Sequence, residues 1–197
     1  MLFRSLLFVP GDRPERFPKA IASAADAVVL DLEDSVSAQG KESARNNVAE
    51  FLTEARTKPV LVRINPLTQD YHADDVDAVM SAPPDALMLP KAEGADDIER
   101  LAALITNRNV PILPIATDTP RSAFELGSYQ QVASHLCGLT WGAEDLPAAL
   151  GAVSSRNEDE TFTAPFEWVR SQVLFAAHAA EVPAIETVFP NISDMQA

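Results

Sequence analysis

The sequence predicts an α/β fold built on parallel strands, arranged either as an open sheet or as a barrel. Short apolar runs alternate with segments of helical spacing, and the first six runs recur at intervals of about 22 to 33 residues. Most of these runs are continuously apolar, which is typical of parallel strands covered on both faces. Repeated right-handed crossovers between neighbouring strands follow from this order.

Seven runs are expected to be strands. They are residues 5–9, 27–32, 60–64, 86–89, 112–116, 136–141 and 184–189. A closed barrel of eight strands typically needs about 250 residues, with about 200 as a lower limit. Seven strands in a chain of 197 residues therefore predict a barrel that stops one unit short of closure.

Apolar residues with helical spacing lie between the strand candidates. Three buried helix faces are predicted, formed by Val48, Phe51, Leu52 and Ala55, by Ile98, Leu101 and Ile105, and by Phe166, Val169, Val173 and Ala177. The acidic pairs Asp74–Asp75 and Asp96–Asp97 are expected at helix starts, where the macrodipole favours negative charge. The polar segment 142–164 interrupts the alternation of strands and helices. It is either a flap or a solvated loop without a role.

Composition excludes several classes of protein. The chain has 15 Lys and Arg against 29 Asp and Glu, a net charge of −14, and 47% apolar residues, which describe a soluble globular domain. The acidic surplus argues against nucleic acid and anionic membranes as partners. The single cysteine, Cys137, is a candidate core residue and suits a reducing compartment. The apolar run near the N-terminus is too short for export, so a cytoplasmic location is expected.

Polar residues follow nearly every predicted strand, at the end where α/β folds build their sites. These positions include Glu33 and Asp34, Arg63, Lys91, Asp118, and Asp145. Acidic oxygen ligands without a His or Cys cluster favour Mg²⁺, and Asp118 and Asp145 are the predicted pair. Arg63 is positioned to bind a substrate carboxylate, which favours a small dicarboxylate or oxo acid.

Each of these residues also has a structural interpretation. Asp118 and Asp145 are alternatively helix N-caps, and Arg63 is alternatively part of an ion pair at a strand end. Lys91 either supplies positive charge to the site or pairs with Asp31, Glu33 or Asp34. A Schiff base on Lys91 is not expected. The three histidines do not converge on one motif, and no chemistry is assigned to them.

Six ordered sequence blocks resemble the citrate lyase beta subunit-like family of the HpcH/HpaI aldolase superfamily. The blocks are residues 4–11, 29–36, Lys41 with 44–45, 62–65, 89–91 and 141–146. The resemblance runs from about residue 4 to residue 194. It implies a TIM-type (β/α) barrel as a single domain over residues 1–197, Mg²⁺ dependence, and reversible carbon–carbon cleavage of a 3-hydroxyacyl-CoA such as citryl-, malyl- or citramalyl-CoA.

The resemblance also implies roles for individual residues. Asp118 and Asp145 correspond to the metal ligands, and Arg63 to the arginine that binds the oxo-acid carboxylate. Glu33 and Asp34 would line the floor and hold metal-bound waters. In the mechanism that we expect from these roles, Lys91 would provide charge near the thioester enolate. The substrate would also contact Pro10, Gly142 and Ala143.

Two departures from the family pattern are visible. Asp118 stands where relatives have Glu, which is one methylene longer and reaches roughly 1.5 Å further. Relatives also continue into a final strand, an Ile-His-Pro block and a C-terminal lid that reaches a neighbouring subunit. The family therefore implies a homo-oligomer, such as a trimer, and this chain is expected to lack the last unit.

The expected partners are an oxo acid and an acyl-CoA, and three alternatives to the lyase stay open. The first is a CoA-independent aldolase acting on 2-oxo acids, and the second is a malyl-CoA thioesterase. The third is a catalytically inactive homologue that binds metal and oxo acid without turnover.

Overall fold

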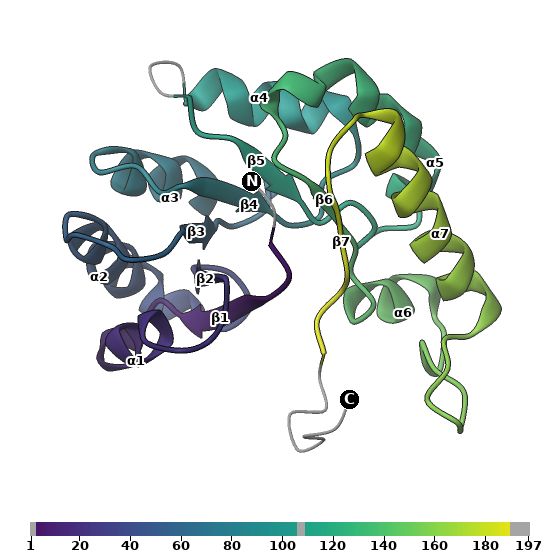
Figure 1. Ribbon diagram of the computed structural model, residues 1–197, viewed down its shortest axis with the longest axis horizontal. Coiled ribbons are helices and arrows are strands. Elements are labelled where there is room, and N and C mark those ends of the chain that lie inside the picture. Colours follow the sequence, from purple (N-terminus) through teal and green to yellow (C-terminus); the bar gives the residue numbers. More distant parts are fainter. Residues whose placement is uncertain (1–2, 106–108, 190–197) are drawn as a thin grey trace.

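The computed structural model describes residues 3–105 and 109–189, and its strands all run parallel to their neighbours (Figure 1). The strands are β1 Leu6–Pro10, β2 Ala27–Asp31, β3 Val60–Arg63, β4 Ala86–Leu89, β5 Ile112–Pro114, β6 Leu139–Thr140 and β7 Ala184–Ile185. Every strand lies within, or within one residue of, a run expected from the sequence. The last three strands are shorter than their apolar runs.

The strands follow one another in space in the order of the chain. One sheet has the order β1-β2-β3-β4-β5, and β6 pairs with β7 in a second sheet. Two parallel bridges, Ile112 to Leu136 and Ile115 to Thr140, connect β5 to the β6 segment. An order without a switch point differs from that of a doubly wound sheet.

Apolar side chains cover both faces of the strands, as their continuous hydrophobicity predicts. Val28, Leu30, Val62 and Leu87 belong to the large core packed against the helices. Alternate residues point to the other face, where a second and smaller cluster is formed by Phe3, Ala27, Val29, Leu61, Ala86, Met88, Leu113 and Cys137. The small cluster is the packed interior of the curved strand layer.

The helices lie on the outer side of the strands (Figure 1). The α-helices are α1 Phe17–Ile21, α2 Lys41–Leu52, α3 Tyr71–Met80, α4 Ala95–Leu104, α5 Ser122–Glu125, α6 Asp145–Leu150 and α7 Ala164–Ala179. The 3-10 helices are η1 Pro14–Arg16, η2 Ala38–Gly40 and η3 Leu126–His135.

The three predicted helix faces correspond to α2, α4 and α7. All four residues predicted for α7 are buried in the core. The face predicted for α2 is one turn too long, because α2 ends at Leu52 and Ala55 is exposed. The Arg56 guanidinium donates to the Leu52 carbonyl at 2.8 Å and so satisfies one of the last carbonyls of the helix. The segment 142–164, for which a flap and a solvated loop are both open, contains α6 and a bridge between Arg156 and Phe162.

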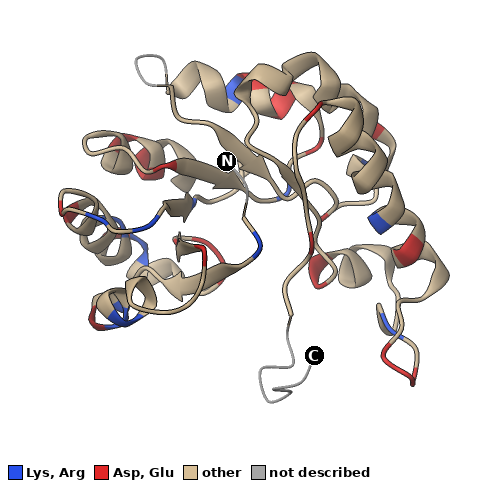
Figure 2. Ribbon diagram, in the orientation of Figure 1, with Lys and Arg blue, Asp and Glu red and all other residues tan. Residues whose placement is uncertain are grey.

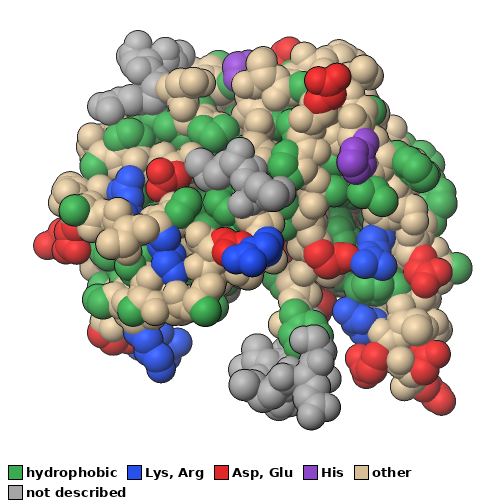
Figure 3. All heavy atoms as spheres, viewed as in Figure 1, with side chains coloured by type: hydrophobic (Ala, Val, Ile, Leu, Met, Phe, Trp, Pro, Cys, Tyr) green, Lys and Arg blue, Asp and Glu red, His purple; other side chains and the backbone are tan. Residues whose placement is uncertain are grey.

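Charged residues lie mainly on the helices and loops, whereas the strands are largely uncharged (Figure 2). On the face in Figure 3, Lys and Arg side chains lie among acidic ones. None of the helices in the described ranges is long and apolar enough to cross a membrane.

Candidate active site

The carboxyl ends of the strands surround one cavity of about 900 Å³. Most of the predicted site residues line it, namely Pro10, Asp34, Arg63, Asp118, Gly142, Ala143 and Asp145. The cavity also extends between the β1 and β7 segments, since residues 3–8 and 184–189 form part of its wall. The sequence expectation that the strand ends converge is therefore met by the geometry.

Arg63, the last residue of β3, is held by Asp31, the last residue of β2. Nε and Nη2 of Arg63 donate to the two carboxylate oxygens of Asp31 at 2.6 and 2.8 Å. Burial disfavours both charges, but the pairing outweighs it: the pKa of Asp31 is lowered and that of Arg63 is raised from their ordinary values. The strand-end ion pair therefore exists, and Arg63 also lines the cavity.

Glu33 lies between the two cations of the site, although its side chain is almost fully buried. Lys91 Nζ donates to Glu33 Oε1 at 2.6 Å, and Arg63 Nη1 lies 3.1 Å from Oε2. Burial raises the pKa of the Glu33 carboxyl, an effect that Arg63 and Lys91 only partly offset. Glu33 thus couples the guanidinium to the ammonium.

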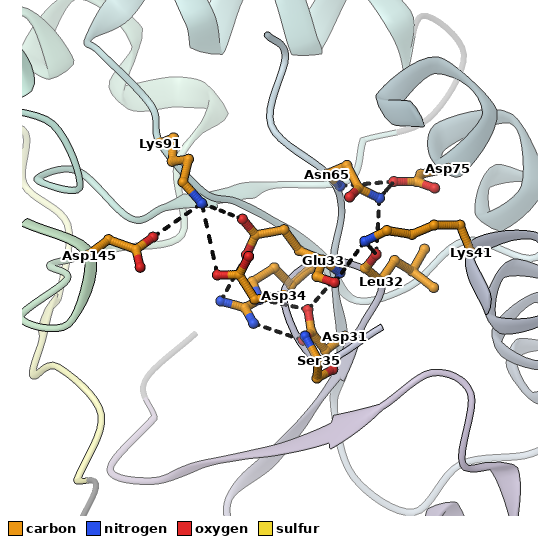
Figure 4. Close-up of polar contacts among 11 residues, drawn as sticks. Asp31, Leu32, Glu33, Asp34, Ser35, Lys41, Asn65, Asp75, Lys91 and Asp145 are labelled. Carbon is orange, nitrogen blue, oxygen red and sulfur yellow. Dashed lines mark hydrogen bonds and ion pairs between the residues drawn. The ribbon is translucent and has the colours of Figure 1, made fainter. Parts of the chain in front are cut away.

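The Lys91 ammonium is surrounded by carboxylates (Figure 4). Its Nζ lies 3.1 Å from Asp145 Oδ2 and 3.9 Å from Asp34 Oδ2, in addition to the bond with Glu33. Burial disfavours the charged amine, yet Glu33 and Asp145 hold the pKa of Lys91 above its ordinary value. The ion-pair alternative for Lys91 is thus observed with Glu33 and Asp34, and a cationic amine is a poor nucleophile for a Schiff base.

The backbone at Lys91 has the left-handed conformation, with φ of 55°. This conformation is unfavourable for a residue with a Cβ and persists where the surroundings enforce it. Here the Lys91 amide donates to Asp118 Oδ2 at 2.9 Å, while the side chain extends to Glu33 and Asp145. With the Asp34 contact, one residue thereby contacts all four predicted site carboxylates.

Asp118 has a buried carboxyl, with only 5% of the residue exposed. Burial raises its pKa to about 7, and the nearby charge of Asp145 adds to the rise. A carboxyl in this condition gains from a cation that can replace lost solvation. Asp145, by contrast, is partly exposed at the first turn of α6.

The helix N-cap alternative is not found for either aspartate. The N-cap of α5 is Arg121, three residues after Asp118, and the N-cap of α6 is Glu144. Both carboxylates point instead to contacts with Lys91, through its amide and its ammonium. This arrangement leaves both aspartates available to the cavity that they line.

Gly142 and Ala143 lie beside the carboxylates, but their amides already have acceptors. Gly142 donates to the Thr117 hydroxyl at 3.1 Å, and Ala143 donates to the Thr187 hydroxyl at 3.2 Å. Thr117 and Thr187 were not expected from the sequence, where a lone threonine beside a strand carries no signal of its own. The role of these two amides toward a substrate stays a prediction.

A further contact, which was not predicted from the sequence, joins the ends of β6 and β7. Glu186 accepts hydrogen bonds from the Trp141 indole and from Arg170 on α7. Trp141 packs edge-to-face on Phe162 of the 142–164 segment, with ring centroids 5.0 Å apart. Trp141 therefore connects the cavity wall to that segment.

The donor set at the cavity fits a hard cation that keeps other ligands. Within residues 3–105 and 109–189, no group of three or more His, Cys, Asp and Glu is arranged to hold a metal by itself. Two carboxylates, Asp118 and Asp145, are nonetheless the number that Mg²⁺ commonly takes from a protein when water and substrate oxygens complete its shell. The buried carboxyl of Asp118 supports this fit.

The fold and the cavity define an α/β protein with acidic and basic side chains at the carboxyl ends of parallel strands. Residues 4–120 match the model of the HpcH/HpaI aldolase/citrate lyase family. The chain belongs to this family, as the sequence blocks indicate. The last part of the expected resemblance, residues 190–194, lies outside the described residues.

Curated proteins and solved structures agree with the family. The chain is 40% identical over 190 residues to a citrate lyase subunit beta-like protein of Mycobacterium tuberculosis, covering 96% of this chain and 66% of that protein. It is 34% identical to a (3S)-malyl-CoA thioesterase of Cereibacter sphaeroides, covering 76% of this chain and 52% of the thioesterase. The chain therefore spans less than two thirds of these relatives.

A solved structure shows the same fold with ligands bound. The citrate lyase beta subunit of M. tuberculosis, complexed with oxaloacetate and magnesium, superposes with a TM-score of 0.82 at 39% identity. The match covers 96% of this chain and 80% of that structure. The relative thus holds a metal and an oxo acid.

Proposed function

We propose that this protein is a Mg²⁺-dependent carbon–carbon lyase that cleaves, or forms, a 3-hydroxyacyl-CoA from an acyl-CoA and a 2-oxo acid. The single observation that carries the proposal is the convergence of Asp118, Asp145 and the Asp31-anchored Arg63 on one cavity. Citryl-, malyl- and citramalyl-CoA are the candidate substrates. The magnesium-and-oxaloacetate complex of the M. tuberculosis relative supports the metal and the acid.

Each residue of the site has a defined task in this reaction. Asp118 and Asp145 would hold Mg²⁺, which when bound lowers the pKa of a substrate hydroxyl and stabilises negative charge on oxygen. Arg63 binds the carboxylate of the oxo acid, and Asp31 fixes the plane of its guanidinium for bidentate contact. Two of its five donors serve Asp31 and one on Nη1 faces Glu33, which leaves two for the substrate.

Lys91 supplies positive charge beside the bond that breaks. Its raised pKa keeps the amine protonated, so it stabilises a developing thioester enolate by charge rather than by accepting a proton. Glu33 and Asp34 balance that charge and would hold metal-bound waters, and Asp34 also lines the cavity. Pro10, Gly142 and Ala143 shape the wall against which the substrate rests.

We also infer that the layer of strands belongs to a TIM-type barrel. The sequential strand order, the bridges between β5 and β6, and the enclosed apolar cluster support it. An eighth strand between β1 and β7 would close the layer where the cavity now opens. A homo-oligomer, including a trimer, and a cytoplasmic location stay predictions.

The decisive experiment uses Mg²⁺ with malyl-CoA or citramalyl-CoA and separates the products. Release of a 2-oxo acid together with acetyl-CoA supports the lyase, whereas release of free CoA and the hydroxy acid identifies a thioesterase. The thioesterase is the second candidate because a relative of that name is 34% identical to this chain. Cleavage of a free hydroxy-oxo acid without CoA would identify the CoA-independent aldolase.

A binding measurement completes the test. Oxaloacetate binding that requires Mg²⁺, without turnover of any of these compounds, would identify an inactive metal- and oxo-acid-binding homologue. Asp118→Glu restores the residue of the family pattern and is expected to raise the affinity for Mg²⁺. Unchanged affinity in Asp118→Glu and in Asp118→Ala would remove this residue from the metal site.

A further inference from the structure

A buried lysine lies behind the peptide that carries Glu33. Lys41 is the first residue of α2 and is only 7% exposed. Its Nζ donates to the carbonyl oxygens of Leu32 and Glu33, each at 2.7 Å. Burial removes the solvation of this cation, and the helix dipole disfavours positive charge at an N-terminus. The two carbonyls are therefore what stabilises the Lys41 ammonium there.

Asn65, two residues after the end of β3, and Asp75 of α3 support the same peptide (Figure 4). The Asn65 side-chain amide donates to the Leu32 carbonyl at 3.0 Å and to Asp75 Oδ2 at 2.6 Å. The Asn65 backbone amide donates to the same carboxylate oxygen at 2.8 Å. Asp75 was expected at a helix start, but only Asp74 lies in the first turn of α3. Asp75 is instead fully buried and lies 3.3 Å from Arg45 Nε.

The bonds on the carbonyl side restrict Glu33, whose buried carboxylate contacts Arg63 and Lys91. Lys41 holds the two carbonyls of Leu32 and Glu33, while the Glu33 carboxylate extends to Lys91 and to Arg63. A rotation of the backbone at Glu33 would break the Lys41 bonds and the contacts of the Glu33 carboxylate together. We propose that Lys41 is a positioning residue, which orients Glu33 and through it the two cations of the site.

This proposal rests on the proposed function, because Arg63 and Lys91 are taken as substrate-binding groups. Lys58 provides a matched control at the opposite end of the sheet. Its Nζ also donates to two backbone carbonyls, those of Ser23 and Ala25, each at 2.7 Å. Lys58 precedes β3, whereas Lys41 acts at the carboxyl end of β2.

The test compares Lys41→Met with Lys58→Met in residue-resolved amide hydrogen exchange. Glu33 and Ser35 donate their amides to Asp31 at 2.9 and 3.1 Å and report on this segment. We expect at least a tenfold faster exchange of these two amides in Lys41→Met, and no change there in Lys58→Met. Oxaloacetate binding in the presence of Mg²⁺ should weaken about tenfold in the first variant alone, because that factor corresponds to about 1.4 kcal/mol, the size of one lost hydrogen bond.

The two readouts separate the possible failures. Unchanged exchange at Glu33 and Ser35 in a folded Lys41→Met variant would overturn the positioning role, whatever the ligand does. A wild-type protein that binds no oxaloacetate with Mg²⁺ would overturn the proposed function, and the exchange result would still decide the role of Lys41. If Lys41→Met does not fold, Lys41→Gln serves, since an amide retains donors but is too short to reach both carbonyls.

Discussion

The carboxylate of Asp118 occupies the space in which a side chain at Gly142 would lie. A Cβ atom at residue 142 would overlap Asp118 Oδ1, and the Ile115 side chain would be only 3.3 Å away on another side. The end of β6 therefore approaches the end of β5 closely because residue 142 has no side chain. The glycine therefore makes room for the carboxylate that we propose as a metal ligand.

Gly142→Ala is expected to displace the Asp118 carboxylate and to weaken Mg²⁺ binding by about tenfold or more, as the loss of one charged contact would. Titration calorimetry with Mg²⁺ measures the effect. Gly127→Ala is the control, because a Cβ there meets nothing within 4 Å. Equal Mg²⁺ affinity in both variants would contradict the steric coupling of Gly142 to Asp118.

Asp118 also predicts how Mg²⁺ binding depends on pH. Burial raises the pKa of this carboxyl to about 7, so it is mostly protonated in the free protein at pH 6. A metal ligand must lose its proton, and apparent affinity should therefore fall towards tenfold per pH unit below about 7. Calorimetry between pH 5.5 and 8 checks this, and a flat profile would exclude Asp118 as a ligand.

The raised pKa of Asp118 also predicts how the free energy of unfolding depends on pH. Because the folded-state pKa is above the ordinary value of 3.8, the folded protein binds this proton more tightly than the unfolded chain. The resulting stability is fully present below about pH 4 and is lost as pH rises through about 7. Asp118→Asn should remove this pH dependence of the unfolding free energy, which amounts to at most about 4 kcal/mol at pH 8. Urea unfolding at several pH values measures it, and parallel profiles would contradict the shift.

The strand ends were predictable because each lies directly after an apolar run, and parallel strands place their carboxyl ends together. Arg63, Asp118 and Asp145, which line the cavity, and Lys91, which contacts Asp145, were found in this way. The residues that hold these side chains in place were not predicted, because their contacts depend on packing across the sheet. Asp75 illustrates the limit: its position in sequence indicates a helix start, and only the fold places its carboxylate against the Asn65 amide.

The role of Gly142 was missed for a related reason. The sequence suggests a backbone amide facing a substrate, whereas the structure gives that amide to Thr117 and the empty side-chain position to Asp118. Spacing along the chain does not reveal which atom of a neighbouring strand fills a missing side chain. Strand ends can thus be read from a pattern of residues, but the contacts between them require coordinates.

Arg63→Gln tests the predicted carboxylate contact. Oxaloacetate binding should weaken about tenfold to a hundredfold, since a hydrogen bond to a charged group contributes about 1.5–3 kcal/mol. The variant should also lose about 3 kcal/mol of unfolding free energy, because Asp31 stays buried without its partner. Arg100→Gln, which removes an exposed ion pair with Asp97, is the control for both measurements. Oxaloacetate affinity equal to that of the wild type would remove Arg63 from the binding site.

The backbone at Lys91 predicts an unusual order of stability between two variants that both lack the ammonium group. With φ of 55°, Lys91→Gly should be more stable than Lys91→Ala by about 1 kcal/mol, because only glycine adopts this conformation without strain. The comparison cancels the loss of the contacts with Glu33 and Asp145. At Lys58, which is outside the left-handed region, the alanine variant should be at least as stable as the glycine variant. Urea unfolding of the four variants measures these differences, and Lys91→Ala equal to or more stable than Lys91→Gly would show that the site stores no backbone strain.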